Sequence, residues 1–218
     1  MRISLIGMAG SGKTYWSSRL EKRGFKRFCC DEMIAEKLEP ELKKPDGSVL
    51  SVAEWMGFPH ESRYQERQEQ YLFLESRVLG RIIDYLEGES GEQQKKVVVD
   101  TTGSVIYVEE QLLRRLSRST TMVLLETPSP VREVLLEAYL RHPHPLVWKG
   151  KFSQHRGESF REALARSYTD LFVSRAALYR TYAHVTATYD EVRRQDFGTE
   201  EFLDFLHAVI KNVPGRVL

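Results

Sequence analysis

The sequence contains few cysteines, no long apolar run and almost no net charge. Its two cysteines, Cys29 and Cys30, are adjacent, and adjacent cysteines rarely pair with each other. We therefore expect both to be reduced and the protein to be cytoplasmic. No apolar run approaches the ~20 residues that cross a bilayer. The 32 basic and 31 acidic residues leave a net charge of +1, which gives no reason to expect a nucleic-acid or membrane partner.

What is present is an alternation of short apolar segments with segments of helical periodicity, in 218 residues that suit one globular domain. This alternation is typical of an α/β fold whose central parallel sheet has helices on both faces. The predicted strands, about five, lie at 3–6, 25–30, 95–100, 120–127 and 184–190. The predicted helices lie at 31–38, 51–57, 60–87, 105–118, 130–141, 158–183 and 199–212. Loops are expected at 39–49, 87–96 and 141–157.

The most specific motif is GMAGSGKT, residues 7–14, which fits G-x-x-x-x-G-K-[ST] in full. It follows an apolar strand and opens a helix, the context of a phosphate-binding loop. Glycines let the backbone wrap a phosphate with N–H groups, and the helix points its positive end at the anion. We expect Lys13 to bridge the β- and γ-phosphates of ATP and Thr14 to bind Mg²⁺. The expected nucleotide-binding residues are Gly7, Gly10, Ser11, Gly12, Lys13 and Thr14.

Two carboxylates are expected at the edge where open α/β sheets bind ligands. Asp100 ends the apolar strand segment VVV (97–99) and is predicted to hold Mg²⁺, directly or through water. The alternative is that Asp100 caps the helix that follows. Asp31 follows the second predicted strand, and it is either a substrate ligand or simply the N-cap of the next helix.

Arg175 lies on the apolar face of the helix predicted over 158–183. Leu171 and Leu178 are on the same stripe, at helical spacing on either side of it. A guanidinium that faces inward needs an anion or several acceptors, because burying an unpaired charge is very costly. Its fork suits a carboxylate or phosphate of a ligand. The alternative is an internal salt bridge to a protein carboxylate.

If the bound nucleotide donates its γ-phosphoryl group, water must be kept away from that group, and residues 142–157 are predicted to form the lid that does so. A cation from this segment would neutralise the transferring phosphoryl group, and Lys149, Lys151 and Arg156 are the candidates. The alternative is a solvated basic loop.

Taken in order, these pieces resemble the shikimate kinase family of small-molecule P-loop kinases. LIGMAGSGKT (5–14) matches its phosphate-binding loop, and FCCDEMIAEKL (28–38) is similar to its Asp-x-Asp-x-x-Ile-Glu segment. The further matching segments are SVAEWMGFPHESRYQE (51–66), VVVDTTGSVI (97–106), HPLV (144–147) and LFVSRAALYRTYA (171–183). The resemblance implies a three-layer P-loop kinase fold with a lid.

The resemblance also implies roles for individual residues. Asp31 corresponds to the aspartate that binds substrate hydroxyls and acts as base. Arg63 and Arg175 correspond to the two arginines of a substrate-carboxylate clamp, and Gly103 to a glycine of the loop that approaches substrate. The chain departs from the family at three positions, where Cys29, Ser104 and His144 replace an aspartate, a glycine and an arginine. Asp100 is expected to take over the role of the carboxylate missing at Cys29.

The sequence therefore predicts a single P-loop kinase domain over 1–218, with a substrate-binding helical region at about 31–87 and a lid at about 142–157. Its expected catalytic residues are Lys13, Asp31 and Arg175. It would use ATP and Mg²⁺ to phosphorylate a hydroxyl of a small polar, anionic acceptor, as shikimate kinases do. Two alternatives stay open: another acceptor such as a nucleoside, nucleotide or sugar acid, or a nucleotide-binding regulator without kinase activity. The acceptor, the choice between ATP and GTP and the oligomeric state are not predicted.

Overall fold

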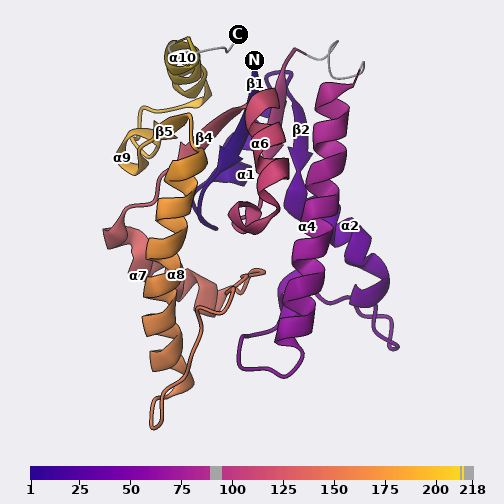
Figure 1. The fold of residues 1–218 in the computed structure, drawn as a ribbon. Coiled ribbons are helices and arrows are strands. Elements are labelled where there is room, and N and C mark those ends of the chain that lie inside the picture. Colours follow the sequence, from indigo (N-terminus) through magenta and orange to yellow (C-terminus); the bar gives the residue numbers. More distant parts are fainter. Residues whose placement is uncertain (89–94, 212, 214–218) are drawn as a thin grey trace.

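The computed structural model describes residues 1–88, 95–211 and 213 (Figure 1). Within these residues five parallel strands form one sheet, in the order β2-β3-β1-β4-β5. The strands are β1 (Arg2–Ile6), β2 (Lys26–Cys29), β3 (Val97–Asp100), β4 (Thr121–Leu125) and β5 (Val185–Ala187). The predicted α/β class and parallel sheet are confirmed.

Helices cover both faces of the sheet. They are α1 (Lys13–Glu21), α2 (Cys30–Leu42), α3 (Val52–Met56), α4 (Tyr64–Glu87), α6 (Glu110–Ser119), α7 (Arg132–Arg141), α8 (Phe160–Tyr182), α9 (Tyr189–Val192) and α10 (Thr199–Ile210). Val97 and Val99 of β3 belong to a large core shared with α4, α6 and α8, whereas Val98 belongs to a smaller core shared with α1 and α10. All three valines are fully buried, as expected for a central parallel strand between two helical layers. In Figure 1, α6 crosses in front of the strands, with α4 and α8 on either side of it.

The carboxyl ends of β1, β2 and β3 lie side by side at one edge of the sheet. Asp100 is paired in register with Leu5 on one side and with Cys29 on the other. The glycine-rich segment follows β1, Asp31 follows β2, and residues 101–104 follow β3. Three segments that are distant in sequence are therefore brought to one place, where ligands bind in open α/β sheets.

Several predicted boundaries are wrong, including the start of the helix predicted over 60–87, which begins at Tyr64. The insertion predicted over 39–49 begins as helix, because α2 continues through Pro40 and buries Leu38 and Leu42 at a spacing of four. The helix predicted over 105–118 is a 3-10 turn (Val105–Tyr107) followed by α6. The strand predicted over 184–190 ends at Ala187, because Thr188 takes the N-cap position of α9.

Most of the loop predicted over 87–96 lies outside the described residues, as does position 212 at the end of the last predicted helix. Across 1–88 and 95–211, no helix combines the length and apolar character needed to cross a bilayer.

Candidate active site

The segment between β1 and α1 is a tight turn that depends on glycine. Gly12 is the N-cap of α1 and has a φ of 101°. Gly7 has a φ of 143°, and a Cβ there would lie 2.7 Å from the carbonyl oxygen of Leu125. A side chain fits neither position without strain. The turn therefore ends at a helix N-terminus, where backbone N–H groups lack partners within the helix and favour an anion.

Lys13 is buried beside this turn and folds back over it. Its Nζ donates hydrogen bonds to the carbonyl oxygens of Gly7 and Met8, each at 2.9 Å. Burial lowers the pKa of Lys13, and the nearby carboxylates of Asp100 and Asp31 oppose that shift. The ammonium group is thus held over the loop between two carboxylates.

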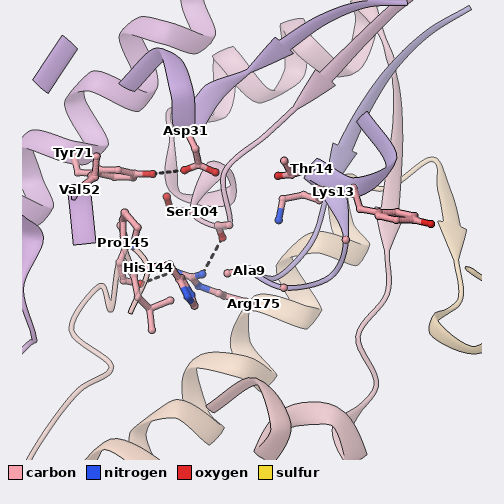
Figure 2. A pocket seen from close by; sticks show the side chains of 16 residues that line it. Ala9, Lys13, Thr14, Asp31, Val52, Tyr71, Ser104, His144, Pro145 and Arg175 are labelled. Atoms are coloured by element: carbon pink, nitrogen blue, oxygen red, sulfur yellow. Dashed lines mark hydrogen bonds between the residues drawn. The ribbon is translucent and has the colours of Figure 1, made fainter. Parts of the chain in front are cut away.

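The turn forms one wall of a cavity of about 530 Å³, a volume typical of small-molecule sites. Lys13, Asp31, Gly103 and Arg175 all line this cavity, and so does Thr14. Figure 2 shows Lys13 and Thr14 on one side and Asp31, Tyr71 and Val52 on the other. The structure therefore brings together most of the residues that the sequence singled out, from four separate segments.

Asp31 is the second residue of α2, and its side chain lines the cavity. Its Oδ1 accepts a hydrogen bond of 2.9 Å from the Tyr71 hydroxyl of α4 (Figure 2). Protein surrounds the carboxylate on its other sides, so burial raises the pKa of Asp31, while Tyr71 and Lys13 oppose the shift. Cys29, and not Asp31, is the N-cap of α2, so the capping alternative for Asp31 is wrong.

Arg175 of α8 is 1% exposed, so the prediction that it faces inward is confirmed. Its Nη1 donates to the Gly103 carbonyl at 3.0 Å and its Nη2 to the Val147 carbonyl at 2.5 Å. The guanidinium also lies 5.2 Å from the centroid of the Tyr107 ring. Backbone carbonyls are therefore the acceptors that compensate this buried charge, in place of the salt bridge considered from the sequence. Arg175 joins the loop after β3 to the segment around Val147.

The loop after β3 is held from its other side by Glu75 of α4. Glu75 is 1% exposed, and its carboxylate accepts hydrogen bonds from Thr102 Oγ1 and, at 2.8 Å, from Ser104 Oγ. Burial raises the pKa of Glu75 to about 7, and the two hydroxyl hydrogen bonds oppose the shift. Sequence analysis missed this residue. Its signal was a carboxylate on the apolar stripe of α4, four residues after Tyr71 and three before Val78.

Asp100 is 1% exposed at the end of β3. Its Oδ2 accepts a hydrogen bond of 2.9 Å from Ser17 Oγ and lies 3.7 Å from Nη2 of Arg27. Its Oδ1 is buried without a hydrogen-bond partner in the described chain. The helix that follows has Ser104 at its N-cap, so the alternative that Asp100 caps it is wrong. Asp100 instead faces α1, next to the lysine of the loop.

Arg63 is not brought to the cavity. It is exposed at the N-cap position of α4 and is absent from the described cavity lining. The buried stripe of α4 begins at the next residue, Tyr64, whose hydroxyl donates to the Leu146 carbonyl at 2.7 Å. A residue one position before that stripe points about 100° away from it. The clamp of Arg63 and Arg175 is therefore not formed in this structure.

The segment predicted as a lid contributes its first part to the cavity. His144, Pro145, Leu146 and Val147 line it, whereas the predicted cations Lys149, Lys151 and Arg156 are exposed and outside the described lining. Burial, followed by repulsion from Arg175 and Lys13, lowers the pKa of His144 to about 4. His144 is therefore neutral near pH 7 and supplies no positive charge.

No model of a known protein family matches the chain. Several solved structures do share its architecture. A shikimate kinase from Acinetobacter baumannii in complex with shikimate is 21% identical, with 96% of this chain and 93% of that chain covered at a TM-score of 0.60. This chain has the shikimate kinase fold. The enzyme from Aquifex aeolicus is 20% identical over 99% and 100% of the two chains at a TM-score of 0.57. That from Bacteroides thetaiotaomicron is 18% identical over 96% and 98% at a TM-score of 0.62.

Proposed function

We propose that this protein is a kinase that moves the γ-phosphoryl group of ATP to a hydroxyl of a small polar acceptor. The observation that carries the proposal is one cavity lined both by the glycine-rich loop with Lys13 and by Asp31, Gly103 and Arg175. A nucleoside triphosphate on the loop and an acceptor beside Asp31 would share this cavity. The shikimate kinase fold supports the same reaction class.

The nucleotide end is formed by the loop and α1. Phosphate oxygens would replace the Gly7 and Met8 carbonyls as acceptors for Lys13, whose charge then stabilises the β- and γ-phosphates. Thr14 lines the cavity, and the unpartnered Oδ1 of Asp100 would accept a hydrogen bond from metal-bound water. Among the described residues no cluster of three or more His, Cys, Asp or Glu side chains is arranged to hold a metal. A site of one or two protein oxygens suits Mg²⁺, which keeps several waters and phosphate ligands and would supply positive charge to the transferred group.

The acceptor end is formed by α2, α4 and the loop after β3. Asp31 would accept a hydrogen bond from the hydroxyl that attacks phosphorus and take its proton. Its raised pKa makes it a better proton acceptor than an ordinary aspartate. Most of the rate gain would come from alignment and charge stabilisation.

In this proposal residues 1–218 form one kinase domain that includes an acceptor region and a lid. Residues 31–87 would form the acceptor region, and they supply Asp31, Val52 and Tyr71 to the cavity wall. Residues 142–157 would form the lid, with His144 to Val147 already against the cavity. One neighbour in the comparison is a complex with shikimate, so shikimate is the first acceptor to try. Other polyols related to shikimate are the next acceptors to try, because Cys29, Ser104 and His144 differ from the residues of the shikimate kinase family at these positions.

ADP release from Mg-ATP, with and without shikimate and a panel of polyols and nucleosides, tests the proposal. We expect at least one acceptor to raise the rate well above basal hydrolysis, and Lys13→Ala to abolish that stimulation. If ATP binds and no acceptor raises the rate, the kinase assignment fails.

A second candidate is a nucleotide-binding regulator without transferase activity. The neutral His144 favours it, because the cavity then has no cation from the lid segment that the structure describes. Nucleotide binding with only basal hydrolysis would be its signature.

A further inference from the structure

The loop after β3 is held between two long helices. From α8, Arg175 Nη1 and the Tyr179 hydroxyl both donate to the Gly103 carbonyl, at 3.0 and 2.5 Å. From α4, Glu75 accepts from the two hydroxyls that flank Gly103 in sequence, Thr102 Oγ1 and Ser104 Oγ. The loop also touches the phosphate-binding turn, since a Cβ on Gly103 would lie 3.2 Å from the backbone nitrogen of Ala9. Its position therefore sets the distance between the nucleotide and acceptor ends of the cavity.

Glu75 also fixes which way the hydroxyls point. Above its pKa Glu75 is ionised and can only accept hydrogen bonds, so both hydroxyl protons then turn toward it. The backbone N–H of Ser104 in turn donates to Thr102 Oγ1 at 3.1 Å. Ser104 lines the cavity, and with its proton committed it presents an oxygen lone pair to a ligand. Asp31, on the neighbouring wall, is likewise an acceptor when ionised.

We propose that Glu75 is a positioning residue for the acceptor, acting through Ser104. It holds the Gly103–Ser104 wall in place and makes Ser104 a hydrogen-bond acceptor, so that the cavity selects a molecule with at least two neighbouring hydroxyl donors, a polyol. One hydroxyl would donate to Asp31 and the other to Ser104. The kinetic consequence of this inference rests on the proposed kinase function. The hydrogen bonds from Thr102 and Ser104 to Glu75, here called the anchor, do not require that function.

The titratable groups around Glu75 come from three helices. They are Tyr71 of its own helix α4, Cys30 and Asp31 of α2, and Arg175 and Tyr179 of α8. Asp31 raises the pKa of Glu75 and Arg175 lowers it, and burial, which raises it, is the largest cause. When Glu75 gains a proton it can donate to Ser104, which frees the serine proton to turn toward the cavity. The wall therefore presents a hydrogen-bond acceptor to the cavity when Glu75 is ionised and a donor when Glu75 is protonated.

Amide NMR of the full chain tests the anchor without any acceptor. In the wild type, the Gly103 and Ser104 amide shifts should titrate with a midpoint near the Glu75 pKa of about 7. Glu75→Gln keeps the shape but adds a donor, and it should remove that inflection. Glu66→Gln, a change of an exposed glutamate in the same helix, should leave it intact. Flat wild-type shifts, or the same inflection in Glu75→Gln, would overturn the proposal. The wild-type titration needs no variant, so it remains decisive if Glu75→Gln does not fold.

Kinetics then test the route through Ser104. With the better of shikimate and methyl shikimate as the probe, Glu75→Gln should lower kcat/KM for the acceptor about tenfold, the equivalent of one charge-assisted hydrogen bond. The affinity for ADP should stay at the wild-type value. In a Ser104→Ala background, Glu75→Gln should lower kcat/KM almost no further. If the losses from the two substitutions were fully additive, Glu75 would not act through Ser104. If no acceptor of the panel is phosphorylated but the NMR inflection is present and lost in Glu75→Gln, the hydrogen bonds from Thr102 and Ser104 to Glu75 stand and the proposed function fails.

Discussion

Cys29 and Asp100 are paired in register across strands β2 and β3, each as the last residue of its strand. Burial raises the pKa of the Cys29 thiol to about 12, so residue 29 is uncharged near pH 7. The family that the sequence resembles has an aspartate there, next to the metal. Asp100 is therefore one strand away from the missing carboxylate and beside Lys13, where it can replace that charge.

Removing the Asp100 charge should impair any Mg²⁺-dependent reaction. We expect Asp100→Asn to reduce ADP release from Mg-ATP about 10- to 100-fold, the range seen when a group that orients metal ligands is lost. Added Mg²⁺ should recover part of the loss. The double variant Cys29→Asp/Asp100→Asn should recover more, because it moves the carboxylate to the paired position.

Asp204→Asn, at an exposed position in α10, is the matched control and should behave as wild type. An Asp100→Asn enzyme with unaltered rate and Mg²⁺ dependence would show that Asp100 serves only to hold Ser17 and Arg27.

An anionic acceptor stays a prediction, but one of the two arginines expected to bind its carboxylate is not at the cavity. Both terminal nitrogens of Arg175 already donate to backbone carbonyls, and Arg63 is outside the described cavity lining. We expect methyl shikimate to stimulate ADP release nearly as well as shikimate, because a carboxylate would meet a single arginine. The terminal nitrogens of that arginine already donate to backbone carbonyls, and its Nε is the nitrogen without a partner in the described chain. A strong preference for the acid, lost in Arg175→Lys, would restore the clamp hypothesis.

Stability should depend on pH through Glu75. Its pKa is about 7 in the folded protein against an ordinary 4.5, so the folded state holds more protons between these values. The free energy of unfolding should therefore fall as pH rises from about 4.5 to about 7, by up to about 3 kcal/mol. Glu75→Gln should lose this slope in urea unfolding.

His144, whose pKa is lowered to about 4, contributes a slope of the opposite sign. The comparison is therefore between Glu75→Gln and Glu66→Gln at each pH. Parallel curves for the two variants would contradict the assignment.

The Tyr71 hydroxyl should set the pKa of Asp31, the proposed general base. Its hydrogen bond lowers the pKa of Asp31, so Tyr71→Phe should raise that pKa further. If ionised Asp31 takes the proton of the attacking hydroxyl, the acidic limb of the pH–rate profile should move to higher pH in Tyr71→Phe. Tyr182→Phe, a change of the tyrosine that ends α8 and lies outside the described cavity lining, provides the comparison. An unmoved limb would mean that another group titrates in that profile.

Much of this fold could be predicted from local sequence. The run of valines at 97–99 and the GMAGSGKT motif identified the central strands and the nucleotide end, since both depend on chemistry within a few residues. The errors fell where tertiary contacts override local signals. Pro40 suggested a loop, but burial of Leu38 and Leu42 extends α2 through it.

The acceptor end was harder to predict, because it depends on which face of each helix is buried. Arg63 was placed by loose motif spacing, yet the buried stripe of α4 begins at Tyr64. Arg175 was correctly placed inward, but its carbonyl partners come from residues 103 and 147, and sequence alone does not show their proximity. Glu75 could have been found by the reasoning used for Arg175, a charge on an apolar helical stripe.

The central claim is that one cavity aligns a nucleotide with an acceptor hydroxyl, and phosphorus NMR of the reaction mixture tests it most directly. Wild-type protein with Mg-ATP and a polyol panel should produce ADP together with a new phosphomonoester signal. Lys13→Ala should produce neither. ADP accompanied by inorganic phosphate alone, with every acceptor unchanged, would contradict the account.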